Sequence, residues 1–201
     1  MKTGGDKTRQ RLLFEAFKLF STKQYDQVTY NDLENATGLS RGAILYHIKN
    51  KETLFRDVVG MFVFRNSTMT SLEESRGTTL KDTIDNFIDR LGREQREWQK
   101  NGITNVNFAM LNIQMSSYTT FPESLSYAKE WYEREVGIWR EVIARAVAEG
   151  EIRRVDPTMF AEIFENTYLG AAYAGLCEEY GYNVERVRYK LHCLYDTIAG
   201  D

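Results

Sequence analysis

The segment of residues 29–48 has the pattern of two short helices joined by a tight turn. Thr29, with Asp32 three residues later, is typical of a capping box that starts a helix. Gly38 is expected to end that helix, because glycine tolerates the left-handed conformation found at helix ends. Ser40 then fits the N-cap of a second helix. A short helix, a glycine turn and a second short helix form a helix-turn-helix.

Apolar residues recur at helical spacing along the rest of the chain, which predicts an all-α fold of about nine helices without a convincing strand. The sequence holds only two prolines, and so few helix breakers favour long helices. Beside the motif, we expect helices over 8–22, from Asn50, from Thr79, over 106–115, over 122–150, over 156–181 and from Asn183, with a turn at Asn101 and Gly102.

The charge is divided unevenly along the chain. Residues 1–51 hold nine Lys and Arg against five Asp and Glu, a net charge of +4, and residues 52–201 hold 17 against 24, a net charge of −7. A basic head on an acidic body suits a protein that touches a polyanion at one end, although a chance imbalance is the alternative. We therefore expect a helix-turn-helix DNA-binding domain over 1–51 and a second, helical domain over 52–201.

The sequence lacks the signals of a membrane protein or an enzyme. It has no run of about 18 uncharged apolar residues and no apolar signal peptide, so we expect no membrane span and a cytoplasmic location. Cys177 and Cys193 form no C-x-x-C pair, and we expect buried free thiols. His47 and His192 are the only histidines, and neither a glycine-rich phosphate loop nor G-x-S-x-G occurs. We expect no metal, no cofactor and no catalytic residue.

The second helix of the motif offers polar and aromatic side chains on its outward face. The N-terminal part of such a helix enters the major groove, where the fork of Arg41 matches two guanine acceptors and Ala43 fits a thymine methyl group. Other residues are placed to hold phosphates. The predicted DNA-binding residues are Thr29, Tyr30, Ser40, Arg41, Gly42, Ala43, Tyr46, His47 and Lys51. The alternative is a three-helix unit that has no role in binding DNA.

Four sequence pieces, LLFEAFKLF, V-T-Y-x-D-L, T-G-L-S-R-G and YHIKNKETLF, follow one another within residues 8–58. In order and spacing they resemble the TetR family of transcriptional regulators, and EGEIRRVDP at 149–157 is similar to the family's link into its dimerisation helices. The chain departs from the family at Gln24, usually glycine, at Glu34, usually alanine, and at Leu45, usually tyrosine. A glutamate between the motif helices must turn outward or find a partner.

The resemblance implies a repressor that binds a palindromic operator in double-stranded DNA as a homodimer and is released by a small-molecule effector bound in the second domain. The alternative is a helix-turn-helix regulator without such an effector, controlled by a protein partner. Aromatic residues at helical spacing are usually core, but they also line apolar ligand pockets. The predicted pocket residues are Phe62, Trp98, Phe108, Met110, Trp131, Trp139, Phe164 and Tyr168. We expect Asn105, Asn107, Asn112 and Gln114 to face solvent, and the alternative is that they are polar groups of such a pocket.

The last two helices have the pattern of a dimer interface. Val187, Leu191 and Leu194 belong to a heptad-like apolar stripe, and Gly170 and Ala174 belong to a strip of small residues that permits close helix contact. Two such helices from each subunit would form a symmetric four-helix bundle. The alternative for both stripes is packing within one chain. A dimer would place two heads about 34–36 Å apart, one turn of DNA, which suits a palindromic site.

Overall fold

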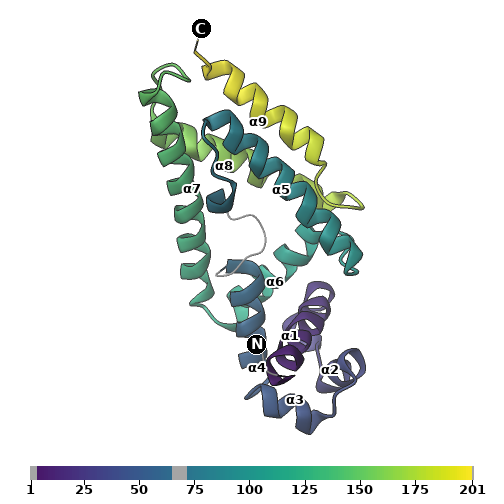
Figure 1. The fold of residues 1–201 in the computed structure, drawn as a ribbon. Helices are drawn as coiled ribbons and strands as arrows, with labels where there is room; N and C mark the ends of the chain where they lie inside the picture. Colours follow the sequence, from purple (N-terminus) through teal and green to yellow (C-terminus); the bar gives the residue numbers. More distant parts are fainter. Residues whose placement is uncertain (1–3, 65–71, 201) are drawn as a thin grey trace. The chain divides into compact units, whose positions relative to one another are not determined.

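The computed structural model describes residues 4–64 and 72–200, and these residues are mainly helical. Its α-helices are α1 (Gly4–Thr22), α2 (Tyr30–Thr37), α3 (Arg41–His47), α4 (Lys51–Val59), α5 (Leu80–Lys100), α6 (Val106–Thr120), α7 (Ser124–Ala148), α8 (Pro157–Ala174) and α9 (Val184–Ile198) (Figure 1). Short connecting helices are η1 (Tyr25–Gln27), η2 (Gly60–Phe64), η3 (Leu72–Ser75) and η4 (Gly175–Cys177), of which η2 is a π-helix. The predicted all-α fold is confirmed, and no described helix is long and apolar enough to cross a membrane.

Cap hydrogen bonds confirm six of the predicted helix starts, whereas the helices expected from residues 8 and 122 begin at Gly4 and Ser124. Thr29 and Asp32 form a capping box at the start of α2, and Gly38 ends that helix at a φ of 69°. Glycine adopts this left-handed conformation without the steric cost that a Cβ would bring. The other predicted N-caps accept backbone N–H groups through their side chains in the same way, namely Ser40, Asn50, Thr79, Asp156 and Asn183.

The end of α8 differs from the prediction. The helix ends at Ala174 and not at Gly181, because the chain turns at Gly175 and returns close to it. A Cβ on Gly175 would lie 2.4 Å from the backbone nitrogen of Tyr182, so only glycine allows this approach.

The predicted burial of the cysteines is also wrong. Cys177, in η4, and Cys193, on the outward side of α9, are both free and exposed.

The residues group into two compact units. Unit 1 comprises Met1–Ser67 and Phe108–Tyr127, and unit 2 comprises Thr68–Asn107 and Ala128–Asp201. This division differs from a boundary after residue 51, because α4 packs on α1 within unit 1. Phe55 of α4 is fully buried, and its ring centroid lies 4.6 Å from that of Phe20 in α1.

Most of α6 belongs to unit 1, where polar side chains join it to the end of α1. Asn112 Nδ2 donates to the carbonyl oxygen of Phe20 at 2.9 Å. Gln24 Nε2 donates to Asn112 Oδ1 at 2.8 Å, and Ser116 Oγ donates to Gln24 Oε1 at 2.7 Å. Gln24, one of the departures from the family pattern, therefore links α6 to the turn after α1. The expectation that Asn112 faces solvent is wrong, because its amide group makes these internal hydrogen bonds.

Unit 2 has one apolar core, formed by α5, α7, α8 and α9 with η3. Helix α9 packs along α5 (Figure 1), and Arg188 of α9 pairs with Asp85 at 3.2 Å and Asp89 at 2.7 Å. Asn105 Nδ2 donates to the carbonyl oxygens of Gly175 and Glu178, and buried Asn107 accepts from the N–H of Tyr182. These two asparagines thus hold the loop after α8, and the expectation that they face solvent is wrong.

Candidate functional site

Helix α3 presents a polar and aromatic outward face. Its inner side is fixed by Ile44, which is fully buried, as is Leu33 of α2. Ser40 Oγ caps the helix by accepting the N–H of Ala43. Tyr46 on this face is 85% exposed. The predicted DNA-binding residues Ser40, Arg41 and Gly42 are exposed as well, while Ala43 and His47 are half-buried.

Glu34 fixes the start of α3 against α2. Its Oε1 accepts the backbone N–H of Arg41 at 2.7 Å. A carboxylate at this place also interacts favourably with the positive end of the α3 dipole. Of the two options open to a glutamate here, outward or partnered, the structure shows a partnered side chain. Glu34, which departs from the family pattern, therefore stabilises the helix-turn-helix.

Arg41 is held beside a hollow in unit 1. Its guanidinium carbon lies 4.5 Å from the ring centroid of Tyr30, a cation–π contact that orders the side chain. The hollow has a volume of about 380 Å³ and is lined by Asp26, Val28, Thr29, Tyr30, Asn31, Arg41 and Lys51. Four of the nine residues predicted from the sequence to bind DNA therefore line one depression beside the start of α2.

Two of these four side chains are already engaged in the fold. The Thr29 hydroxyl donates to Asp32 Oδ2 at 2.7 Å. Hydrogen bonds from Lys23 and Thr29 hold the pKa of Asp32 well below its usual range, so this cap stays ionised at neutral pH. Lys51 Nζ donates to the carbonyl oxygens of Tyr25 and Val28, each at 3.0 Å. An ammonium group has three donors, which leaves Lys51 one N–H, and Nζ also lies 4.3 Å from the ring centroid of Tyr25.

The eight predicted pocket residues divide between the two units. Trp98, Trp131, Trp139, Phe164 and Tyr168 belong to unit 2, whereas Phe62, Phe108 and Met110 belong to unit 1. Trp139, Phe164 and Tyr168 are part of the unit 2 core, and Phe62 packs on Phe14 and Phe17 of α1. Trp98 is buried, Met110 and Trp131 are half-buried, and Phe108 is 52% exposed.

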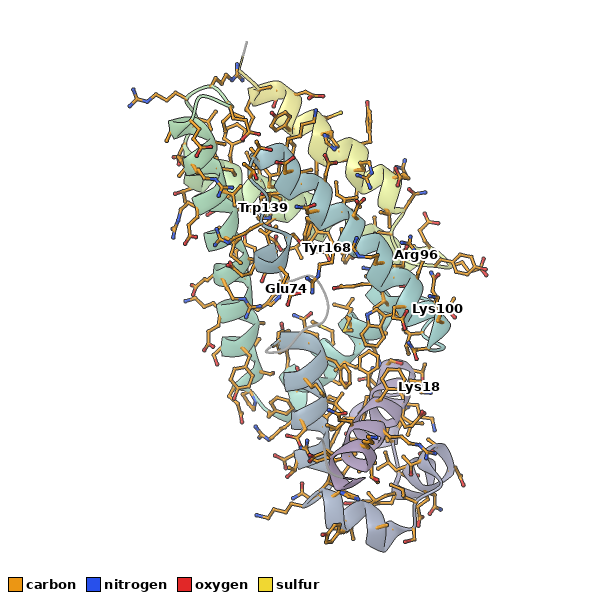
Figure 2. The ribbon with its side chains drawn as sticks, viewed as in Figure 1. Lys18, Glu74, Arg96, Lys100, Trp139 and Tyr168 are labelled. Atoms are coloured by element: carbon orange, nitrogen blue, oxygen red, sulfur yellow. The ribbon has the colours of Figure 1, made fainter. Side chains whose placement is uncertain are left out.

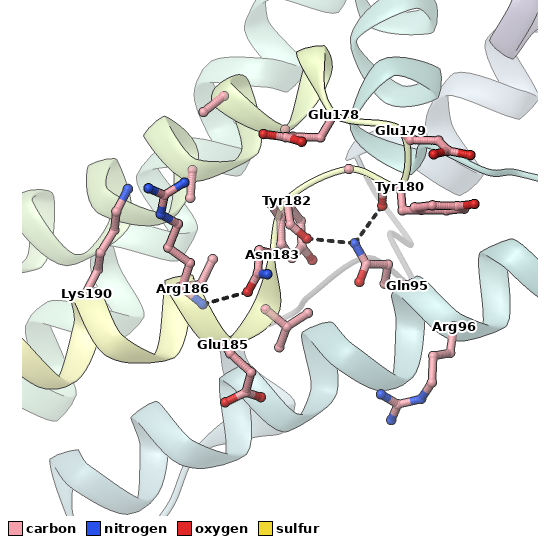
Figure 3. Close-up of a pocket in the computed structure, with 16 residues that line it drawn as sticks. Gln95, Arg96, Glu178, Glu179, Tyr180, Tyr182, Asn183, Glu185, Arg186 and Lys190 are labelled. Atoms are coloured by element: carbon pink, nitrogen blue, oxygen red, sulfur yellow. Dashed lines mark hydrogen bonds between the residues drawn. The ribbon is translucent and has the colours of Figure 1, made fainter.

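A groove in unit 2 lies at the connection between α8 and α9 (Figure 3). It has a volume of about 930 Å³, and none of the eight predicted pocket residues lines it. Gln95 Nε2 of α5 closes one side by donating to the carbonyl oxygens of Tyr180 and Tyr182, each at 2.9 Å (Figure 3). Among the lining residues are Ala174 and Val187, two of the predicted dimer residues.

The predicted dimer residues divide into two groups. Val187 and Leu191 are buried in the unit 2 core, where α9 packs on α5 and α8, and Leu194 is half-buried against that core. Gly170 and Ala174 of α8 are exposed. The outward sides of the same two helices carry Tyr173, which is 73% exposed, Tyr189, which is 72% exposed, and Lys190 and Cys193. In α9 the heptad-like stripe thus serves packing within the chain.

Sequence reasoning missed a buried carboxyl pair in unit 2. Glu165 is only 2% exposed, and Trp139 Nε1 donates to its Oε2 at 3.2 Å. Burial, with a smaller contribution from the nearby charge of Glu135, raises the pKa of Glu165 to about 8. Burial also raises the pKa of Glu135. The available signal was an acidic residue between the apolar residues of FAEIFENTYLGAAYA in α8.

Comparison with known proteins identifies the N-terminal region. Residues 12–58 match the sequence model of the bacterial regulatory proteins of the tetR family. The N-terminal region of the chain, over residues 12–58, thus has the sequence of a TetR-family DNA-binding region. The family that this region matches consists of bacterial regulatory proteins.

Curated relatives resemble the chain over about a quarter of its length. The transcriptional repressor AcnR of Corynebacterium glutamicum is 46% identical over 54 residues, which are 25% of this chain and 29% of AcnR. The transcriptional regulator AcrR of Shigella flexneri is 35% identical over 57 residues, which are 28% of this chain and 26% of AcrR. The matches therefore span less than a third of these relatives.

Solved structures match nearly the whole chain. The SmeT–triclosan complex has a TM-score of 0.72 at 17% identity and covers 97% of this chain and 93% of SmeT. NalD, the secondary repressor of the MexAB-OprM multidrug efflux pump of Pseudomonas aeruginosa, has a TM-score of 0.65 at 16% identity, with 99% of each chain covered. At these identities the likeness shows the fold alone. The likeness in fold includes unit 2, beyond the region matched in sequence.

Proposed function

We propose that this TetR-family chain is a transcriptional repressor that binds a palindromic DNA operator as a homodimer and leaves it when a small molecule binds. The observation that carries the proposal is the outward face of α3, where Arg41 is ordered by Tyr30 beside exposed Ser40, Gly42 and Tyr46. An arginine at the start of a recognition helix matches the two acceptors of a guanine edge.

Phosphate contacts would supply much of the affinity. Residues 1–51 carry a net charge of +4, and the hollow beside α2 brings Arg41 and Lys51 together. The remaining N–H of Lys51 and the hydroxyl groups of Tyr30 and Tyr46 suit phosphate oxygens. Thr29 contributes to this surface by capping α2, since its hydroxyl is bonded to Asp32. His47 completes the proposed face at the end of α3.

The proposed homodimer uses the outward sides of α8 and α9. Gly170 and Ala174 are small enough for a second copy of the helix to come close, and Tyr173 and Tyr189 add exposed aromatic area at the same two helices. A two-fold dimer buries the same surface on both subunits, so two helices from each would form a four-helix bundle. Two heads related by this symmetry would bind a palindrome.

Release by a ligand requires that the ligand prefer a state with lower DNA affinity. Helix α6 is placed to transmit such a preference, because it contributes residues to both units. Asn107 accepts the N–H of Tyr182 in unit 2, and Asn112 donates to Phe20 at the end of α1 in unit 1. The relative SmeT, whose solved complex contains triclosan, supports a small-molecule effector for this chain as well.

The second candidate is a helix-turn-helix regulator without a small-molecule effector, controlled by a protein partner. Exposed Tyr173 and Tyr189 favour it as much as they favour a homodimer. A thermal-shift screen of small molecules separates the two, because a ligand that binds the folded state raises the melting temperature.

Selection of bound duplexes from a random DNA pool tests the proposal. The full chain should enrich one palindromic site, with an affinity that falls steeply as salt rises. Enrichment of a single half-site would contradict the homodimer, and no enrichment even at low salt would contradict sequence-specific binding.

A further inference from the structure

One oxygen of Glu165 lies in the aromatic core of unit 2 without a partner. Oε2 accepts the indole N–H of Trp139 at 3.2 Å, whereas Oε1, equally buried, has no hydrogen-bond partner among the described residues. A buried polar atom without a partner costs free energy that an apolar side chain of similar size would not. The fold therefore gains nothing from this oxygen, which is free to accept a bond from a ligand.

The neighbouring acid, Glu135, is used differently. It lies one helical turn before Trp139, so both side chains are on the same side of α7. Its Oε2 accepts the N–H of Leu72 and its Oε1 accepts from Arg134 Nε, each at 3.1 Å. Among the described residues, the one cation bonded to either of these two acids is Arg134, and it is bonded to Glu135. A further positive charge beside Glu165 would relieve the repulsion between the two carboxyl groups.

Aromatic rings cluster at Trp139, the hydrogen-bond partner of Glu165. The ring centroid of Trp139 lies 5.2 Å from that of Phe164 and 5.7 Å from that of Phe87, and Phe87 lies 5.2 Å from Tyr168. Figure 2 labels Trp139 and Tyr168 in this part of unit 2. Ring faces attract cations, most strongly away from water. The rings alone would accept a neutral ligand, and the unpartnered carboxyl oxygen adds a preference for a positive charge.

We propose that the effector is an organic cation, an amine or quaternary ammonium that carries apolar groups, and that Glu165 Oε1 is its counter-ion. The proposal rests on the proposed ligand-controlled function and names the chemical class of the ligand. Anionic ligands are disfavoured, since the charge of Glu135, and that of Glu165 where it is ionised, would repel them. Because Glu165 is buried, its surroundings must open to admit the cation, which couples binding to a change of shape.

A matched pair of probes tests the charge. Benzyltrimethylammonium and neopentylbenzene have the same shape and differ by one positive charge. The cation should raise the melting temperature of the full chain, and the neutral compound at equal concentration should raise it much less. The quaternary ammonium has the same charge at every pH, so any pH dependence of its affinity comes from the protein. With the pKa of Glu165 at about 8, the affinity should rise about 50-fold from pH 6 to pH 8.

Three variants assign the effect to Glu165. Glu165→Gln keeps the size of the side chain and an acceptor for Trp139, and it should lose both the cation preference and the pH dependence. Glu135→Gln removes the neighbouring charge, so the pH midpoint of binding should move lower. Glu133→Gln, at an exposed glutamate of α7, is the control and should behave as the wild type. Melting curves show whether each variant is folded.

The proposal is overturned if the wild type binds no cation, if both probes stabilise it equally, or if Glu165→Gln keeps the preference. Operator binding, measured without probes, separates this inference from the proposed function. A chain that binds its selected operator but fails the cation test remains a regulator with a different effector. A chain that binds the cation through Glu165 but no operator keeps the site and loses the regulatory role.

Discussion

Replacing Glu165 by glutamine is expected to stabilise the protein, and to stabilise it more at higher pH. Burial raises the pKa of Glu165 to about 8 from its ordinary 4.5. At neutral pH the folded chain therefore holds this carboxyl group protonated, whereas the unfolded chain releases the proton. Folding takes up a proton, so this group lowers the stability as the pH rises from about 4.5 towards about 8. Glutamine is neutral throughout and carries no such cost.

The size of the effect follows from the two pKa values. Each pH unit between them is worth about 1.4 kcal/mol. The free energy of unfolding of Glu165→Gln should exceed that of the wild type by about 1 kcal/mol at pH 5 and by about 3 kcal/mol at pH 7. Glutamine still offers an oxygen to Trp139 Nε1, so the hydrogen bond at 3.2 Å does not account for the difference.

Urea unfolding followed by circular dichroism measures this difference. The wild type, Glu165→Gln and the exposed control Glu133→Gln are compared at about pH 5 and about pH 7. The gap between Glu165→Gln and the wild type should widen with pH, while the control should follow the wild type. A gap of equal size at both pH values would refute the reasoning, because a change in packing alone does not depend on proton uptake.

Three further substitutions test the head. Glu34→Ala removes the acceptor of the Arg41 N–H, so it should lower the free energy of unfolding by about 1 kcal/mol and weaken operator binding. Glu34→Gln keeps an acceptor and should retain most of the stability and of the operator affinity. Equal urea midpoints for the two variants would count against the contact. Gly38→Ala places a Cβ at a φ of 69° and should cost about 1 kcal/mol, which an unchanged urea midpoint would disprove. Asn112→Ala removes the bond to Phe20 and should speed amide exchange at the end of α1, and wild-type exchange rates there would argue against the link.

The parts of the fold that were predicted from the sequence depend on neighbours along the chain. Thr29 with Asp32, Gly38 and Ser40 mark the ends of α2 and α3 because a cap involves only residues within one turn. The outward face of α3 follows from the same helical periodicity.

Long-range contacts decided what the sequence left open. Val187 and Leu191 form an apolar stripe that suits an interface and an intrachain core equally. The stripe lies in the core because α9 packs on α5, with which Arg188 forms an ion pair. The early end of α8 depends on the close approach of Tyr182 to Gly175. Periodicity carries no information about these partners, because Asp85 is 103 residues from Arg188 and Tyr182 lies beyond the end of α8.

The ligand-binding site was the part that the sequence predicted least well. An aromatic residue at helical spacing has the same pattern in a core and in a pocket, and Trp139 and Phe164 lie in the core. The informative residue was Glu165, whose polar side chain contradicts the apolar helix around it. Its burial and its unpartnered oxygen became visible only in three dimensions.

The central claim is that the outward face of α3 recognises a DNA sequence through Arg41. The most direct test is a titration of the selected operator, and of an unrelated duplex, with the wild type, Arg41→Ala and the control Arg140→Ala at an exposed position of α7. Arg41→Ala should bind the operator about 5- to 150-fold more weakly, a loss of about 1–3 kcal/mol, and should lose most of its preference over the unrelated duplex. Arg140→Ala should bind as the wild type does. Wild-type affinity and selectivity in Arg41→Ala would contradict the account.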